Sequence, residues 1–227
     1  MLELKNVHAY YQDKEILSDI SINFKDKQRV CILGESGVGK TTLLSLLMGK
    51  IKHTGTLKNT FNNISIVYQK DGLFKWLTVY ENLKITKPDV KEEVIDKYLI
   101  EFNLLDQKDS FIDNISTGQA QRVQIIRALL ANSDLILLDE PSSALDVNNK
   151  EIFNKYLVKN VDNYIYVTHD VQEACLIADR IIILKDKKIV EDIKNIESSK
   201  RNLDNEDFYK HIISIRSKLW LKNSLLT

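Results

Sequence analysis

Three of the seven glycines in this chain stand between positions 34 and 39, at Gly34, Gly37 and Gly39. A short apolar run without alternation, residues 30–33, comes directly before them, and residues 40–47 follow without a helix breaker. The run is typical of a strand buried on both faces of a parallel sheet, and the following segment is typical of a helix. The glycines therefore mark a turn from a buried strand into a helix, which favours an α/β fold.

Similar apolar runs recur along the chain, with helical patterns between them, at residues 64–68, 135–138, 164–168 and 181–184. Strands that alternate with helices predict an α/β sheet. The N-terminal part differs, because Ile20, Ile22 and Phe24 alternate with polar residues. Such alternation predicts a half-exposed antiparallel strand, which we expect to pair with residues 2–7.

Between residues 69 and 132 the strand-like runs stop, which predicts a helical lobe inserted into the α/β core. One face of a lobe helix is predicted to carry Val90, Val94, Tyr98, Leu99 and Phe102. We expect one domain over residues 1–227, with a core at about 1–69 and 133–197 and a lobe at about 70–132. A tail at about 198–227 is predicted to form a helix through Phe208, Ile212, Ile215 and Leu219.

The glycine-rich turn satisfies the phosphate-loop (P-loop, or Walker A) pattern G-x-x-x-x-G-K-[ST] in the strand–helix context that the pattern requires. Glycines let successive backbone N–H groups surround a phosphate, and the N-terminus of the helix adds positive potential. Lys40 is suited to the β- and γ-phosphates, and the Thr41 hydroxyl is suited to Mg²⁺. The predicted loop residues are Gly34, Glu35, Ser36, Gly37, Val38, Gly39, Lys40, Thr41 and Thr42.

A second pair of candidate residues, Asp139 and Glu140, follows the apolar run at 135–138 and precedes Pro141. A buried strand that ends in two carboxylates directs them toward the ligand crevice of an α/β sheet. Asp139 is predicted to hold Mg²⁺, and Glu140 is predicted to accept a proton from the attacking water or to orient it.

These motifs and four further features resemble the ATP-binding subunit of an ABC transporter over about residues 1–197. Tyr11 stands where that family places an aromatic ring that stacks on adenine, although Tyr10 is adjacent. Gln69 resembles the glutamine that senses Mg²⁺ at the lobe boundary. His169 resembles the histidine that contacts the γ-phosphate, and residues 143–146 resemble the loop that faces a second subunit.

The most family-specific feature is the segment 115–122, ISTGQAQR, which resembles the signature motif LSGGQ. The resemblance implies that Ser116, Gly118 and Gln119 bind the nucleotide of a partner subunit. We expect Ser116 or Thr117 to cap the following helix. Thr117 replaces the first of the two glycines in the family motif, and the segment from 41 to 68 is shorter than is usual.

The resemblance implies a P-loop ATPase with a catalytic set of Glu140, His169, Gln69 and Lys40, and with Mg²⁺ ligands Thr41, Gln69 and Asp139. It also implies a homodimer or an ABC-type heterodimer on the cytoplasmic face of a cell membrane, held there by an integral membrane permease. Residues 72–82 and 168–174 are similar to importers of nitrate, sulfonate, taurine and related small solutes, which would add a substrate-binding protein. An exporter is the alternative.

Two other classes of protein share some of these features but fit the sequence less well. The first is a switch GTPase, which would need a guanine-specificity motif after a strand late in the chain. Residues 86–89, TKPD, match the letters of that motif, but they come before Asp139 and follow no buried strand. A soluble ABC protein of translation would need two phosphate loops in one chain, and this chain has one. An ABC ATPase of DNA repair would need inserted coiled coils or zinc sites, for which this chain has no room. The formal net charge of zero also disfavours nucleic acid as a partner.

The remaining composition bears on the cell compartment. Cys31 and Cys175 are far apart and match no metal spacing, so we expect two reduced, buried cysteines in a cytosolic protein. No apolar stretch is long enough to span a bilayer, and the N-terminus lacks the pattern of a signal peptide.

Overall fold

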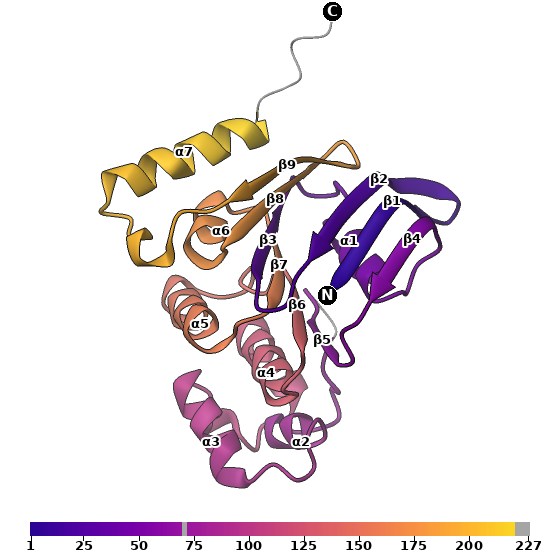
Figure 1. Ribbon diagram of the computed structural model, residues 1–227. Coiled ribbons are helices and arrows are strands. Elements are labelled where there is room, and N and C mark those ends of the chain that lie inside the picture. Colours follow the sequence, from indigo (N-terminus) through magenta and orange to yellow (C-terminus); the bar gives the residue numbers. More distant parts are fainter. Residues whose placement is uncertain (70–71, 221–227) are drawn as a thin grey trace, which may run out of the picture. The chain divides into compact units, whose positions relative to one another are not determined.

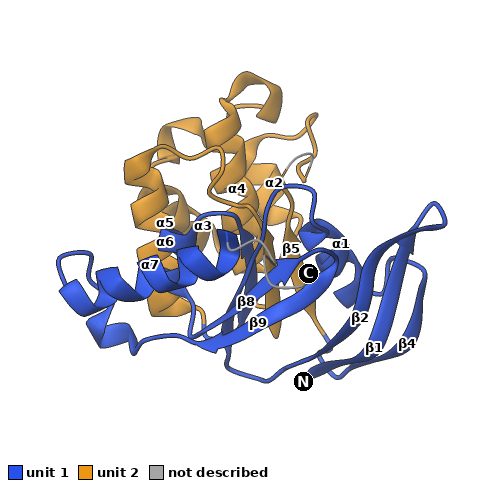
Figure 2. Ribbon diagram, turned by 90° about the horizontal axis from the view of Figure 1, so that it is seen from above, with its two compact units in different colours: residues 1–62, 162–227 blue, residues 63–161 orange. Residues whose placement is uncertain are grey.

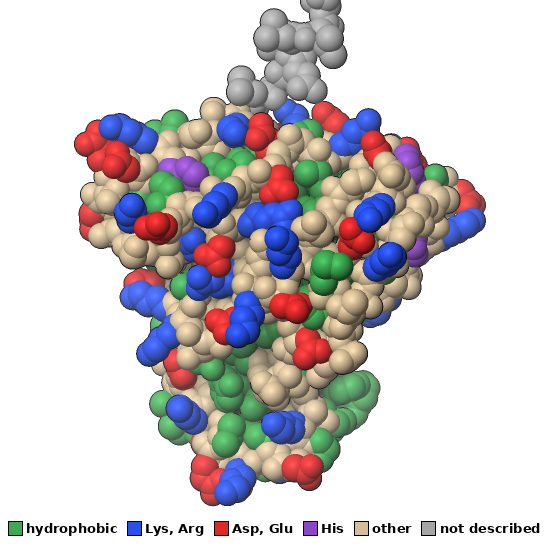
Figure 3. Space-filling view, viewed as in Figure 1, with side chains coloured by type: hydrophobic (Ala, Val, Ile, Leu, Met, Phe, Trp, Pro, Cys, Tyr) green, Lys and Arg blue, Asp and Glu red, His purple; other side chains and the backbone are tan. Residues whose placement is uncertain are grey.

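The computed structural model describes residues 1–69 and 72–220, and the chain divides into two compact units (Figures 1 and 2). The first unit joins Met1–Asn62 to the described residues from Asp162 onward, and the second is Asn63–Val161. No helix in the described part of the chain is long and apolar enough to cross a membrane. On the face shown in Figure 3, basic and acidic side chains are interspersed, in keeping with the zero net charge.

An antiparallel sheet of three strands forms the N-terminal part of the first unit. Its order is β2 (Lys14–Phe24), β1 (Leu2–Tyr11) and β4 (His53–Asn59). Gln12 and Asp13 connect β1 to β2 with φ values of 46° and 62°, as a tight two-residue hairpin turn requires. Alternate residues of β2 are buried through Ile20, Ile22 and Phe24, so the predicted half-exposed strand and its pairing are confirmed.

The rest of the first unit is an α/β layer, shown in Figure 1. The parallel strands β7 (Tyr164–Thr168), β3 (Arg29–Leu33) and β8 (Arg180–Lys185) lie in that order, and β9 (Lys188–Lys194) pairs antiparallel to β8. The helices α1 (Lys40–Leu47) and α6 (Val171–Ile177) follow β3 and β7. The core of β3 is buried on both faces, as its unbroken apolar run predicts. Cys31 and Cys175 are buried and free, as predicted.

The C-terminal helix α7 (Glu206–Trp220) follows a short 3₁₀ turn, η3 (Ser198–Lys200). Its buried face consists of the four residues that the sequence pattern predicts, which are Phe208, Ile212, Ile215 and Leu219. Asp179 ties the start of this tail to the sheet, because it accepts hydrogen bonds from Arg29 at 2.7 Å and from Arg201 at 2.8 Å. Residues 221–227 of the predicted tail lie outside the described part.

His211 of α7 predicts how acid affects stability. Its Nε2 lies 2.8 Å from Asn195 Oδ1, and burial, together with Arg201 and Lys218, lowers its pKa from 6.5. The unfolded chain therefore binds this proton more readily, so the contribution of His211 to stability is full above about pH 6.5 and declines as the pH falls below that value. We expect the melting temperature to fall between about pH 7.5 and 5.5, and to fall less for His211→Gln. Parallel pH profiles for the two proteins would contradict this prediction.

The second unit has a parallel strand pair, β5 (Ile64–Val67) and β6 (Leu135–Asp139), and a set of helices between and after them. The helices are α2 (Val79–Lys84), α3 (Glu92–Glu101), η1 (Leu105–Gln107), η2 (Ile112–Asn114), α4 (Thr117–Leu130) and α5 (Val147–Asn160). Apart from an isolated bridge of Thr78 with Phe111, no strand lies among the described residues between β5 and β6. The predicted change from strands to helices after residue 69 is therefore confirmed.

The predicted face of the lobe helix is correct for Leu99 and, in part, for Tyr98, and it is wrong for Val94. α3 begins at Glu92, so Val90 and Phe102 lie outside it although both are buried. Ile95 and Leu99 form the buried face, while Val94 is 41% exposed. The sequence pattern included Val90 and Phe102, which are buried in the turns that flank α3, as parts of the helix itself.

Candidate functional site

The glycine-rich loop joins β3 to α1 in the first unit, as the motif predicts. Gly37 and Gly39 have φ values of 79° and 111°, in the region that only glycine adopts readily. A Cβ at Gly39 would lie 3.0 Å from Leu17 Cδ2, so the loop packs closely against β2. A glycine-rich backbone of this kind directly ahead of a helix is suited to bind a phosphate.

Lys40 and the beginning of α1 supply the positive charge of this loop. Lys40 is 5% exposed, and its Nζ donates hydrogen bonds to the carbonyl oxygens of Gly34 and Glu35, both at 2.9 Å. The N-cap of α1 is Gly39, which has no side chain that could accept the first N–H groups of the helix. The loop therefore combines helix N–H donors with a buried ammonium group, and this donor set fits the phosphates of a nucleotide. Thr41 is exposed beside them.

His169 belongs to the same edge of the sheet. β3 and β7 are parallel, and Leu33 pairs with Thr168, so Gly34 and His169 leave adjacent strands together. The His169 side chain is exposed. The first unit thus brings the phosphate loop and His169 together at the carboxyl ends of parallel strands, where ligands bind in α/β sheets.

Tyr11, the predicted adenine contact, ends β1 and is 61% exposed, whereas its neighbour Tyr10 is partly buried. β1 pairs with β2, and β2 carries the Leu17 side chain that lies close to Gly39. An exposed ring on the same small sheet is suited to stacking on a base, so the exposures favour Tyr11 over Tyr10.

The second unit holds the other predicted catalytic residues. Val67 of β5 pairs with Leu138 of β6, so Gln69 and the pair Asp139–Glu140 follow the same end of two parallel strands. Asp139 is 5% exposed and Glu140 is half-buried. Glu140 has a φ of 45°, a conformation that costs a residue with a side chain of this kind about 1–3 kcal/mol. Strain of this kind at a predicted catalytic position is consistent with a functional constraint.

The signature segment forms the beginning of α4. Ser116 is the N-cap, as expected: its side chain accepts from Gln119 N at 3.2 Å, and Gln119 Oε1 accepts from Ser116 N at 2.8 Å. A Cβ at Gly118 would lie 2.8 Å from the carbonyl oxygen of Ala144, so only glycine fits there. Thr117 is exposed at the first helical position.

Asp146, in the segment that resembles the loop facing a second subunit, has a structural role. It is the N-cap of α5 and accepts from Asn149 N at 2.9 Å. Hydrogen bonds from Asn149, together with the charge of Arg122, lower its pKa. Its position is therefore explained by helix capping within the second unit.

A pocket of about 520 Å³ opens beside Gln69 in the second unit, lined by Gln69 itself and by residues from the segments 72–75, 112–115, 117–124 and 143–144. Two exposed aromatic residues, Phe74 and Trp76, follow Leu73 closely in the sequence. Trp76 is 71% exposed, and its ring lies 5.3 Å from that of Phe74, which is 38% exposed. Phe74 and Trp76 do not line the pocket themselves, but their sequence neighbours Leu73 and Lys75 do. Exposed aromatic side chains are typical of a protein-binding surface.

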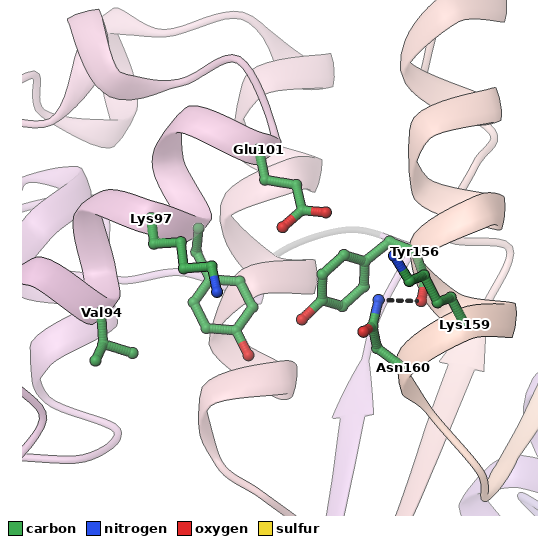
Figure 4. Close-up of a pocket in the computed structure, with 7 residues that line it drawn as sticks. Val94, Lys97, Glu101, Tyr156, Lys159 and Asn160 are labelled. Carbon is green, nitrogen blue, oxygen red and sulfur yellow. Dashed lines mark hydrogen bonds between the residues drawn. The ribbon is translucent and has the colours of Figure 1, made fainter.

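A different pocket, of about 460 Å³, lies between α3 and α5 (Figure 4). It contains none of the predicted site residues. Tyr98 and Tyr156 pack with their ring centroids 6.0 Å apart, and Asn160 donates a hydrogen bond to the Tyr156 carbonyl oxygen. Burial raises the pKa of the Tyr156 hydroxyl. The contact between the two tyrosine rings joins α3 to α5.

The predicted residues therefore fall into two groups, one in each unit. Tyr11, the phosphate loop and His169 belong to the first unit, and Gln69, the signature residues, Asp139 and Glu140 belong to the second. The sequence pattern did not single out the buried polar residues beside these groups, and Glu173 is one of the most completely buried of them. Glu173 of α6 is 2% exposed, and its only signal in the sequence is a carboxylate among the apolar residues that follow His169.

Comparison with known proteins identifies relatives that match most of this chain in sequence. A model of the ABC transporter family matches residues 17–143. The chain is 35% identical over 213 residues to the aliphatic sulfonates import ATP-binding protein SsuB 1 of Paracoccus denitrificans, with 90% of this chain and 88% of that protein covered. It is 33% identical to the spermidine/putrescine import ATP-binding protein PotA of Spiroplasma citri, with 100% and 71% covered.

Solved structures give the same result. The dimeric structure of MJ0796, described as a bacterial ABC transporter cassette, matches with a TM-score of 0.73 and 27% identity, over 87% of this chain and all of that one. A dimeric post-hydrolysis state of the same cassette, bound to ADP and Pi, matches with a TM-score of 0.71 and 26% identity over the same shares. The predicted α/β P-loop fold and the resemblance to sulfonate-type importers are thereby confirmed.

Proposed function

Because the chain belongs to the ABC transporter family, we propose that it binds and hydrolyses ATP with Mg²⁺ to drive a small solute through a separate membrane permease. The observation that carries this proposal is the phosphate loop. There, a backbone that only glycine readily adopts precedes a helix without a capping side chain, and a buried lysine lies against the loop. The names of its relatives, which are import ATP-binding proteins, support import rather than export.

In this proposal the nucleotide is held mainly by the first unit. Lys40 binds the β- and γ-phosphates, the loop N–H groups surround them, and Tyr11 stacks on adenine. Mg²⁺, when bound, neutralises charge on the phosphates. Its proposed protein ligands are Thr41, Gln69 and Asp139, all with the oxygen donors that Mg²⁺ prefers. Few protein ligands are needed, because Mg²⁺ keeps several waters and binds phosphate oxygens.

Glu140 is the proposed general base, and His169 is the proposed contact to the γ-phosphate. A carboxylate directly after a buried strand end has a fixed backbone and a half-exposed side chain, which suits it to orient a water molecule or to accept its proton. His169 is exposed at the edge where the phosphate loop begins, so it is placed to donate a hydrogen bond to a phosphate oxygen.

We also propose that two such chains, or this chain and a similar one, form the working dimer. Ser116, Gly118 and Gln119 of one subunit would then bind the nucleotide held by the phosphate loop of the other. The solved relatives are dimeric by their titles, which supports this arrangement. The reciprocal hydrogen bonds between Ser116 and Gln119 also stabilise the start of the helix that would face the nucleotide.

The proposed organisation is one ATP-binding domain over residues 1–227, on the cytoplasmic face of the membrane. It has a core at about 1–69 and 133–197, a lobe at about 70–132 and a tail at about 198–227. The permease would dock at the pocket beside Gln69, with Phe74 and Trp76 as its contacts. A substrate-binding protein would deliver the solute to that permease.

This docking surface predicts the effect of Trp76→Ala. The change is expected to weaken the complex with the permease by at least about 30-fold, or ~2 kcal/mol, because exposed tryptophans act as anchors of interfaces. ATP binding by the isolated chain should be unchanged. Trp220→Ala is the matched control, because Trp220 is also largely exposed but belongs to α7. Equal losses in the two variants would contradict docking at this surface.

The proposed activity is tested by phosphate release from Mg²⁺–ATP by the purified chain, with GTP as competitor. We expect ATP to be hydrolysed and GTP to compete poorly. Co-purification of the chain with its membrane partners tests the direction of transport. A permease that arrives with a soluble or lipid-anchored binding protein supports import, and a permease without one supports export.

A further inference from the structure

Glu173, four positions after His169, is almost completely buried, although nothing in the family resemblance assigns it a role. Glu173 is 2% exposed on α6, among Val171, Ala174 and Cys175, which are all buried. A carboxylate in such surroundings is costly unless it accepts hydrogen bonds. One such bond comes from Thr168, whose Oγ1 donates to Glu173 Oε2 at 3.0 Å.

That hydrogen bond is part of a network that encloses His169 on both sides. Thr168 is the last residue of β7, and Asp170 is the N-cap of α6. Asp170 N donates to Thr168 Oγ1 at 3.0 Å, and Glu173 N donates to Asp170 Oδ1 at 3.1 Å. The two residues that flank His169 are therefore bonded to each other and to Glu173.

The direction of these bonds explains why a hydrogen-bond acceptor stands at position 173. The Thr168 hydroxyl already accepts from Asp170 N, so it needs an acceptor for its own hydrogen. Glu173 supplies a buried oxygen from the helix that packs on β7 and β3 (Figure 1). The hydroxyl is thereby fixed in one rotamer, and the turn that carries His169 is fixed with it.

We infer that Glu173 is a positioning residue, which holds the His169 turn in place through the Thr168 hydroxyl. The turn starts beside Gly34, so its rigidity sets where the exposed imidazole stands relative to the phosphate loop. This inference rests on the proposed role of His169 in ATP hydrolysis. In this inference Glu173 acts through Thr168 and the His169 turn rather than by touching the nucleotide.

The test uses ATP turnover, ATP affinity and melting temperature of the full chain. Glu173→Ala is expected to lower kcat by about 10- to 100-fold, the usual cost of losing the support of a catalytic group, with little change in ATP affinity. Glu173→Gln keeps an acceptor oxygen and should retain most of the activity. In a His169→Ala background, Glu173→Ala should have no further effect on kcat, because the group that it positions is absent.

A second pair of variants covers the case in which Glu173→Ala does not fold. Thr168→Val removes the hydroxyl at nearly constant shape and should lower kcat like Glu173→Ala, whereas Thr168→Ser keeps the hydroxyl and should not. A further loss from Glu173→Ala on top of His169→Ala would overturn the inference, as would equal activity of Thr168→Val and Thr168→Ser. Normal turnover by His169→Ala alone would instead overturn the proposed role of His169, and with it the basis of this inference.

Discussion

Replacing Glu140 by glutamine is expected to lower ATP hydrolysis by about 10²–10⁴-fold, the usual scale of general-base catalysis. Glutamine keeps the size and hydrogen-bonding capacity of the side chain but lacks a basic oxygen. It also accepts the same left-handed backbone no worse than glutamate does, so the φ of 45° at this position should persist. Steady-state phosphate release, compared with the unmodified chain at saturating Mg²⁺–ATP, measures the effect.

The same variant should bind ATP normally, because Lys40, the loop and Asp139 are unchanged. Asp139→Asn is the informative companion, since it removes a proposed Mg²⁺ ligand and should weaken Mg²⁺-dependent binding itself. A near-normal hydrolysis rate in Glu140→Gln would refute the role of Glu140. His169 would then be the leading candidate for positioning the attacking water.

The second large effect is expected for Lys40→Ala, which should weaken ATP binding by at least about 30-fold, or ~2 kcal/mol. Lys40 is the buried cation of the phosphate loop, and its ammonium group lies within hydrogen-bond distance of two loop carbonyl oxygens. Without the Lys40 ammonium group, the negative charge of the β- and γ-phosphates loses the nearest cation of the protein. Equilibrium titration with a fluorescent ATP analogue, confirmed by calorimetry with ATP, measures the affinity.

Lys50→Ala is the matched control for this experiment, because Lys50 is exposed and follows α1 shortly after the loop. Its affinity for ATP should equal that of the unmodified chain. A melting curve of Lys40→Ala separates a lost phosphate contact from a disturbed loop. If Lys40→Ala kept full affinity while folded, the phosphate-loop assignment would be rejected.

The elements whose signals are local could be predicted from the sequence. The strand before the phosphate loop is an unbroken apolar run because both of its faces are buried, and the stripe of α7 repeats at helical spacing because one face is buried. The position of the glycine-rich loop between β3 and α1 could also be predicted, since a backbone with positive φ at Gly37 and Gly39 requires glycine there.

Features that depend on tertiary contacts could not be predicted. The phase of α3 depends on where the preceding turn ends, so Val94 was placed on the wrong face. Glu173 was missed because a carboxylate in a helix is normally solvent-exposed, and only the structure shows the Thr168 hydroxyl that it accepts from. The choice of Tyr11 over Tyr10 also gained support only when their exposures were known.

The most direct test of the account is the mass of Glu140→Gln protein in solution, measured by light scattering on a size-exclusion column. Two nucleotides enclosed between two phosphate loops and two signature segments should join the subunits for as long as ATP is not hydrolysed. We predict a dimer with Mg²⁺–ATP and a monomer with ADP. A protein that is saturated with ATP and remains a monomer would contradict the composite site on which the proposed function depends.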